Sequence, residues 1–164
     1  MLIDLQSVFW EDGPYSESDR RAAQAAILME IDAAKAAGTP VIAIRQEWSI
    51  PSTKLIARLA MKGQAVAGTP GTGLAAPFAD IADHSIIKRV QDAFETGELD
   101  QVLNSLDVGR LRLVGLDFNY CVLKTALAAR NRGYEVTVVG PGTLAAASTE
   151  KAQALLAEKG VIVV

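Results

Sequence analysis

Cys121, the single cysteine of the chain, is the residue with the clearest capacity for chemistry. It follows the apolar run Leu111–Gly115 by one short turn and is predicted to lie in the first turn of the next helix. A helix amino terminus carries unpaired N–H groups and a partial positive charge, so this position is expected to lower the thiol pKa and favour the nucleophilic thiolate. A buried structural cysteine is the alternative that residue type alone favours.

Asp4 lies within the otherwise apolar predicted strand Met1–Leu5, and Lys88 directly follows the predicted strand His84–Ile87. A buried carboxylate without a partner is costly, so Asp4 requires either a cation nearby or a place at the open end of its strand. A simple surface salt bridge is the alternative for this pair. Together with Cys121, the two residues supply a thiolate, a proton carrier and a cation, which suffice for attack on a carbonyl followed by protonation of the leaving group.

These residues need a scaffold that brings the ends of several strands together. Short β-branched runs alternate with longer alanine-rich stretches, which is typical of an α/β fold with a parallel sheet. Such sheets bind ligands outside the carboxyl ends of their strands, near the point where strand order reverses. Six strands are predicted to form one sheet: Met1–Leu5, Val41–Ile44, His84–Ile87, Leu111–Gly115, Glu135–Val139 and Val161–Val164.

The predicted helices lie between these strands. The first is expected to begin after Ser16, whose hydroxyl can cap the turn with Asp19, and to end at Gly38. The stretch from Ser49 to Asp83 is expected to hold a helix and a long loop over the ligand end, and Gly140–Thr143 is predicted to be a turn. Further helices are expected over Leu99–Leu106, Tyr120–Arg132 and the residues from Ser148 to Gly160.

Composition narrows the classes of function. The 164 residues fit a single domain over residues 1–164, and the net charge of -3 argues against nucleic-acid binding. No apolar run approaches the ~20 residues that span a bilayer, and the first residues lack the order of a signal peptide, so a cytoplasmic protein without membrane contact is expected. A surface rich in alanine and leucine predicts a homo-oligomer, either dimer or tetramer.

Aromatic side chains also lie on the segments that follow the strands. Phe9, Trp48, Phe94 and Phe118 are the candidates for substrate binding, because a pocket with aromatic walls suits a small planar amide or ureide. Packing in the core is the alternative for each ring. The expected partner is therefore a small-molecule substrate.

Several segments occur in an order that resembles a known family. They are Leu2–Gln6, Ile87–Lys88 with Phe94, Gly115–Val122 and Thr125–Ala126. The chain resembles the isochorismatase-like cysteine hydrolases, which include the nicotinamidases. The resemblance covers nearly the whole length, since Gly133–Val139 is similar to the fifth strand of that family.

The resemblance implies a three-layer α/β/α, Rossmann-like fold and a catalytic triad of Asp4, Lys88 and Cys121. In that triad Asp4 accepts the thiol proton, Lys88 stabilises charge, and water hydrolyses an acyl-thioester, so that a C–N bond of a small amide, ureide or carbamoyl substrate is cleaved without a cofactor. The resemblance also implies a cis peptide bond between Leu116 and Asp117, with the backbone N–H groups of Asp117 and Cys121 as the oxyanion hole.

Two features depart from the family pattern. Nicotinamidases carry an aspartate and histidines for a metal after the second strand, whereas Arg45–Ser49 contains no histidine and His84 begins the third strand, so no metal site is expected. Asp117 replaces a small residue, and its carboxylate would oppose an oxyanion unless it points away, pairs with an arginine or meets a cationic substrate group. Vinyl-ether hydrolysis of the isochorismatase type and a catalytically silent binding protein are the alternatives.

Overall fold

A sheet of six parallel strands forms the centre of the molecule in a computed structural model that describes residues 1–52, 55 and 65–164. The strand order is β3-β2-β1-β4-β5-β6, so the order reverses between β1 and β4, where Rossmann-like sheets bind their ligands. The α/β fold expected from the sequence is confirmed. The strands are β1 (Leu2–Ile3), β2 (Ile42–Gln46), β3 (His84–Lys88), β4 (Arg110–Gly115), β5 (Glu135–Thr143) and β6 (Ile162–Val163).

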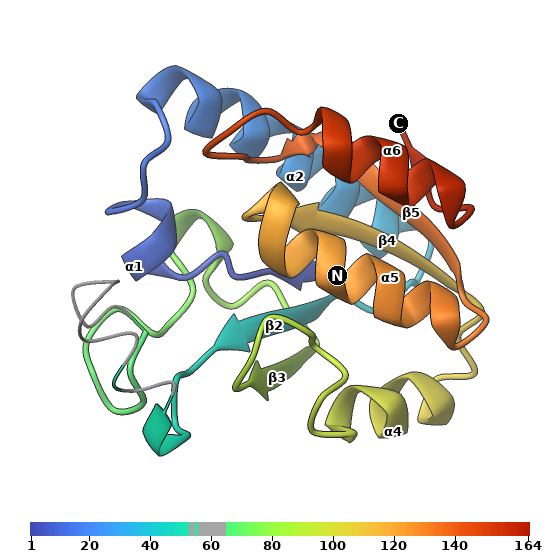
Figure 1. The fold of residues 1–164 in the computed structure, drawn as a ribbon, viewed down its shortest axis with the longest axis horizontal. Helices are drawn as coiled ribbons and strands as arrows, with labels where there is room; N and C mark the ends of the chain where they lie inside the picture. The colour runs from blue at the N-terminus through green and yellow to red at the C-terminus, as the bar shows by residue number, and fades with distance from the viewer. Residues whose placement is uncertain (53–54, 56–64) are drawn as a thin grey trace.

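Helices cover both faces of this sheet and give three layers (Figure 1). On one face α2 (Glu17–Ala36) packs through Ala23, Ile27 and Ile31 into an apolar cluster. On the other face lie α4 (Glu98–Ser105), α5 (Leu123–Asn131) and α6 (Glu150–Glu158), which contribute to a second cluster. The remaining short elements are α1 (Ser7–Trp10), the 3-10 helix η1 (Ala76–Phe78) and the π-helical turn η2 (Phe118–Val122).

The ends of α2 follow the signals in its sequence. The Ser16 hydroxyl accepts a hydrogen bond from the Asp19 N–H at 3.1 Å, which confirms the predicted cap. The helix ends at Ala36, two residues before Gly38, whose φ of 64° suits glycine.

The bounds of all six strands differ from the prediction by one or more residues, and two of these differences have a clear local cause. β1 ends at Ile3 because Asp4 takes a left-handed conformation, with φ 52°, that carries the chain out of the sheet. β5 continues through Gly140–Thr143, which is therefore not the predicted turn. The pairing of β4 with β5 shifts register between Leu113 and Gly115, so that Gly140 and Gly142 remain within the strand. The Gly140 N–H donates to the Val164 carbonyl at 2.8 Å.

Only part of the stretch from Ser49 to Asp83 can be compared with the prediction. Residues 53–54 and 56–64 of this stretch, for which a helix and a long loop were expected, lie outside the described residues. Within the loop that follows, residues 71–75 run antiparallel to residues 5–8: Ser7 N–H donates to Gly73, and Ala75 N–H donates to Leu5. The loop therefore lies beside the carboxyl end of β1.

Gly115 is required where β4 ends beside β1. Its φ is 124°, and a Cβ atom at this position would collide with the backbone carbonyl of Ile3. Glycine thus lets β4 approach β1 closely just before the chain turns toward Cys121. The Leu116 N–H donates to the same Ile3 carbonyl at 3.0 Å, which fixes the first residue of that turn.

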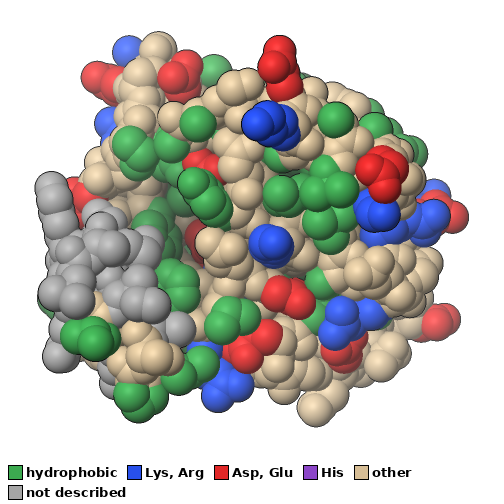
Figure 2. Space-filling model, viewed as in Figure 1, with side chains coloured by type: hydrophobic (Ala, Val, Ile, Leu, Met, Phe, Trp, Pro, Cys, Tyr) green, Lys and Arg blue, Asp and Glu red, His purple; other side chains and the backbone are tan. Residues whose placement is uncertain are grey.

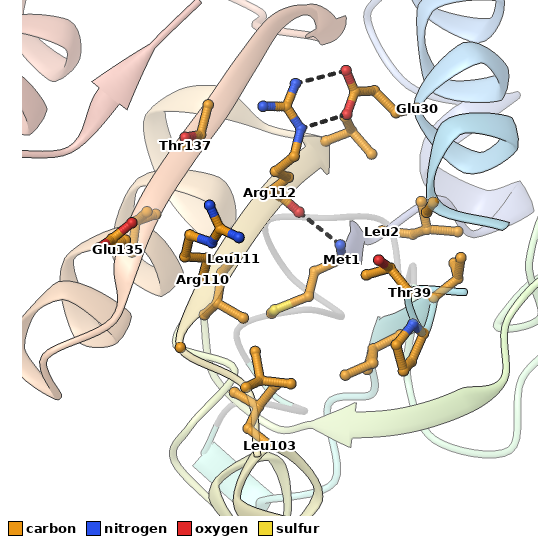
Figure 3. A pocket seen from close by; sticks show the side chains of 18 of the residues that line it. Met1, Leu2, Glu30, Thr39, Leu103, Arg110, Leu111, Arg112, Glu135 and Thr137 are labelled. Carbon is orange, nitrogen blue, oxygen red and sulfur yellow. Dashed lines mark hydrogen bonds and ion pairs between the residues drawn. The ribbon is translucent and has the colours of Figure 1, made fainter. Parts of the chain in front are cut away.

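A cavity of about 740 Å³ lies at the amino-terminal edge of the sheet (Figure 3). The Met1 amino group donates to the Arg112 carbonyl there at 2.7 Å, and burial lowers its pKa to about 5. Beside it, the Arg112 guanidinium forms two 2.7 Å hydrogen bonds with Glu30. Because all the strands run in the same direction, this cavity lies at the opposite edge of the sheet from the carboxyl ends of the strands.

The surface of the face that carries α4, α5 and α6 is mixed in charge. Figure 2 shows acidic and basic side chains interspersed there among hydrophobic ones. Among the described residues, no helix has both the length and the apolar character required to cross a membrane.

Candidate active site

Asp4, Lys88 and Cys121 meet at the carboxyl-terminal edge of the sheet. The Lys88 ammonium lies 2.9 Å from Asp4 Oδ2 and 3.2 Å from Cys121 Sγ. Lys88 is fully buried and only 2% of Asp4 is exposed, so the pair is a buried ion pair and not a surface salt bridge. Cys121 remains partly accessible. The structure therefore brings together the three residues that the sequence singled out.

The sheet explains why residues so far apart in sequence converge. Asp4 directly follows β1, and its N–H donates to the Ile44 carbonyl of β2 at 2.9 Å. Lys88 is the last residue of β3 and pairs in register with Gln46 of β2. Cys121 follows β4, which is the other neighbour of β1. Strands β3, β2, β1 and β4 are adjacent and parallel, so their carboxyl ends supply all three side chains.

Cys121 lies within the π-helical turn Phe118–Val122, which continues into α5. Cys121 was predicted to lie in the first turn of the next helix, and the structure shows that this turn is π-helical. The preceding peptide bond between Leu116 and Asp117 is cis, at the position that the family resemblance implied.

The electrostatics of the thiol differ from the prediction. Burial raises the pKa of Cys121, and the Asp4 carboxylate raises it further, against the opposing effect of Lys88. The expectation of a lowered thiol pKa was wrong because it counted the helix terminus and left out desolvation and the neighbouring carboxylate. Cys121 therefore rests as a neutral thiol and requires a base when it attacks.

The lysine remains a cation. Burial lowers the pKa of Lys88, but the Asp4 carboxylate and the contacts with Asp4 and the Cys121 sulfur outweigh burial, so the pKa lies above its ordinary value. An ammonium beside the sulfur stabilises negative charge when it develops there. Lys88 is thus a fixed positive charge and not a proton carrier at neutral pH.

Two buried glutamines complete the polar cluster. Gln46 Oε1 lies 2.6 Å from the Lys88 ammonium, and Gln6 contacts the backbone of Gln46 in both directions. Gln6 falls in the segment Leu2–Gln6 and Gln46 in the segment Arg45–Ser49, but neither glutamine was predicted to have a role in the site. The available signal was the same as for Lys88, namely a polar residue that ends an apolar strand.

The carboxylate of Asp117 is held by three donors. The Asn119 N–H contacts Oδ1 at 2.8 Å, while the Ala146 N–H and the Tyr15 hydroxyl contact Oδ2 at 2.7 and 3.2 Å. Burial and the charge of Asp117 raise the pKa of Tyr15, which keeps the phenol a donor. Asp117 thus caps the turn that carries Cys121, which gives this unusual acid a structural role. No sequence pattern indicated Tyr15.

The four aromatic candidates have different environments. Phe9 and Trp48 are half-buried, and the indole N–H of Trp48 is buried without a hydrogen-bond partner among the described residues. Phe94 and Phe118 are 2% and 3% exposed and belong to the core. Packing accounts for those two rings, and contact of the four with substrate stays a prediction.

The residues after β2 do not fit a metal site built from aspartate and histidines. Glu47, Trp48 and Ser49 follow β2, and the chain's one histidine, His84, lies at the amino end of β3, opposite Lys88. Over residues 1–52, 55 and 65–164, no group of three or more His, Cys, Asp or Glu side chains is arranged to share a metal ion.

A parallel α/β sheet with a buried aspartate and lysine and a partly accessible cysteine at its carboxyl edge is the arrangement that the resemblance to isochorismatase-like hydrolases implied. A family model described as the Isochorismatase domain matches residues 1–163. The chain therefore belongs to the isochorismatase family, as the sequence resemblance indicated. No curated protein matches the chain.

Solved structures share this fold over almost the whole chain. N-carbamoylsarcosine amidase from Thermoplasma acidophilum is 21% identical, with a TM-score of 0.82 over 99% of this chain and 92% of its own. The pyrazinamidase of Pyrococcus horikoshii in complex with zinc is 23% identical, with a TM-score of 0.81 over 99% and 96%. The nicotinamidase from Bacillus subtilis is 20% identical, with a TM-score of 0.76 over 99% and 96%. At these identities the likeness shows the fold.

Proposed function

We propose that the protein is a cysteine hydrolase that cleaves a C–N bond of a small amide, ureide or carbamoyl compound through an acyl-thioester on Cys121. The observation that carries the proposal is the buried Lys88 ammonium, which contacts both Asp4 and the Cys121 sulfur. Membership of a hydrolase family and structural neighbours that are named as amidases support the C–N bond as the target.

In this mechanism Asp4 accepts the thiol proton as the sulfur attacks the substrate carbonyl carbon. A base is needed because the pKa of the buried thiol is raised. The S–C bond forms, the carbonyl electrons move to oxygen, and the backbone N–H groups of Asp117 and Cys121 stabilise the oxyanion. When the tetrahedral intermediate collapses, the C–N bond breaks and the nitrogen takes the proton from Asp4.

The second half-reaction returns the free thiol. Asp4, again a carboxylate, accepts a proton from water as the water oxygen attacks the thioester carbonyl. The S–C bond then breaks, and the sulfur leaves beside the Lys88 ammonium, which stabilises it until Asp4 returns the proton and both groups regain their resting states. Lys88 stays protonated throughout, in agreement with its raised pKa.

The test is a panel of small amides, ureides and carbamoyl compounds, with release of ammonia or amine as the readout. We expect at least one compound to be turned over, and we expect Cys121→Ala to lower kcat by more than about a thousandfold, as removal of a catalytic nucleophile does. Cys121→Ser serves as the matched variant, since it keeps the size of the side chain but supplies a poorer nucleophile.

Two results would contradict the proposal. Turnover that survives Cys121→Ala would exclude the thiol mechanism. Absence of any turnover across the panel, by a protein that is folded, would favour a silent binding protein.

A further inference from the structure

The Lys88 ammonium has three N–H groups, and three acceptors surround it. They are Asp4 Oδ2 at 2.9 Å, Gln46 Oε1 at 2.6 Å and Cys121 Sγ at 3.2 Å. The shortest of the three contacts is thus made by a neutral amide that takes no part in the mechanism above. We propose that Gln46 is a positioning residue, whose carbonyl oxygen holds the Lys88 ammonium so that its other two N–H groups reach Asp4 and Cys121.

The side-chain amide of Gln46 is fixed in one orientation. Its Nε2 group donates to the Lys88 backbone carbonyl at 3.2 Å while its Oε1 accepts from the Lys88 ammonium. A flipped amide would place NH₂ against the ammonium and oxygen against the carbonyl, which would lose both hydrogen bonds. Because Gln46 is 1% exposed, water cannot replace them, and the amide clamps both ends of the lysine.

Gln6 in turn fixes the backbone of Gln46. Its Oε1 accepts from the Gln46 N–H at 2.6 Å, and its Nε2 donates to the Gln46 carbonyl at 3.0 Å and to the Thr72 carbonyl at 2.9 Å. Gln6 is fully buried as well. A chain of buried amides therefore runs from the loop at Thr72 to the lysine, and it holds the end of β2 at a set distance from β3.

The neutrality of Gln46 matters for the charge balance. Asp4 and the sulfur share the positive charge of Lys88, and a carboxylate at position 46 would be a further anion in contact with the same ammonium. Such a group would weaken the stabilisation of a thiolate at Cys121. An apolar side chain at position 46 would instead remove the shortest contact of the ammonium, so that the Lys88 side chain would no longer be held in position to donate to the sulfur.

The experiment measures alkylation of Cys121 by iodoacetamide between pH 6 and 10 in Gln46→Glu and Gln46→Met. Cys121 is the only cysteine of the sequence, so the mass increase reports this thiol alone. We expect both variants to react at about a tenth of the wild-type rate at a given pH, which corresponds to a thiol pKa raised by roughly one unit. The effect should be larger in Gln46→Glu than in Gln46→Met. Gln101→Glu, the same substitution at an exposed position of α4, should leave the profile unchanged.

A role in packing alone would change stability but not this profile. The proposal is contradicted if both variants fold, as judged by circular dichroism, and their alkylation profiles superimpose on that of the wild type. If Gln46→Met does not fold, Gln46→Glu decides, because it keeps the size of the side chain and an acceptor oxygen.

The expected effect of the Gln46 variants on amide hydrolysis rests on the proposed function. In that reaction, kcat should fall by a larger factor than KM rises. Alkylation requires no substrate, so the two hypotheses can fail separately. A shifted alkylation profile in a protein that hydrolyses none of the amides would support the positioning role and contradict the proposed function.

Discussion

The thiol of Cys121 lies near a carboxylate and an ammonium, and their opposing effects decide its protonation state. The raised pKa means that burial and Asp4 together outweigh Lys88. A resting thiol of this kind reacts slowly with alkylating reagents at neutral pH, even if the protein is an active enzyme. Slow labelling of Cys121 is therefore not a sign of an inactive site.

Asp4→Asn should separate the reactivity of the thiol from catalysis. The substitution removes the negative charge that raises the thiol pKa, so the sulfur ionises at lower pH beside Lys88, and alkylation at pH 7 should become at least several-fold faster. Turnover should fall more than about a hundredfold, because the base is lost. Rates of iodoacetamide labelling and of amide hydrolysis on the same sample check both expectations.

Asp107→Asn is the matched control for that variant. Asp107 is exposed and has a φ of 51°, close to the 52° of Asp4, so the two substitutions make the same chemical change in the same backbone conformation. The control should alter neither rate. If the Asp4→Asn protein is labelled more slowly than the wild type, the Asp4 carboxylate is not the charge that raises the thiol pKa.

For individual residues, the sequence predicted which side chains meet at the site but not the protonation state of the thiol. Asp4, Lys88 and Cys121 were recognisable because each is a chemically active side chain within an apolar strand or shortly after one. The thiol pKa could not be predicted, since it depends on burial and on the distance to a carboxylate more than a hundred residues away. The contact between Tyr15 and Asp117 was hidden for the same reason.

Among the elements, the junction of β1 and β4 has the most demanding geometry. Gly115 brings the end of β4 against Ile3, and the chain then passes through Leu116 and Asp117 to the turn that carries Cys121. Any side chain at position 115 would push apart the two strands whose ends hold Asp4 and Cys121.

Gly115→Ala should therefore destabilise the protein and distort the site. The left-handed φ and the collision with a backbone atom together predict a loss of about 2 kcal/mol or more in the free energy of unfolding. Denaturation by urea measures this loss, and amide hydrolysis should fall in parallel. Gly109→Ala is the control, because beyond the two neighbouring residues no atom lies within 4 Å of the added methyl group, and the effect should be small. Equal unfolding free energies for the two variants would exclude the close approach as a constraint.

Elements with a strong hydrophobic period were predicted closely, while their ends were not. The prediction placed α2 correctly because Ser16 caps it and its buried face repeats through Ala23, Ile27 and Ile31. The prediction ended β5 too early, since local propensity at Gly140 and Pro141 opposes a strand that pairing with β4 and β6 nevertheless extends. Tertiary pairing decided that boundary.

In the whole molecule, all six strands run in the same direction, so their carboxyl ends lie at one edge of the sheet and their amino ends at the opposite edge. The carboxyl edge carries Asp4, Lys88 and Cys121, and the cavity at the amino edge is lined instead by residues such as Glu30 and Arg112. The class of fold and the place of the site both follow from the alternation of strands and helices in the sequence. The substrate does not, because its recognition depends on side chains that converge from several loops.

The most direct test of the central claim is to capture the acyl-enzyme. A substrate identified from the amide panel is mixed with the enzyme, the reaction is stopped with acid within milliseconds to seconds, and the intact protein is weighed and digested. We expect a mass increase equal to the acyl group, located on the peptide that contains Cys121 and absent from Cys121→Ala. Steady turnover by the wild type, with no adduct at any time and with undiminished turnover by Cys121→Ala, would contradict the claim that Cys121 is the nucleophile.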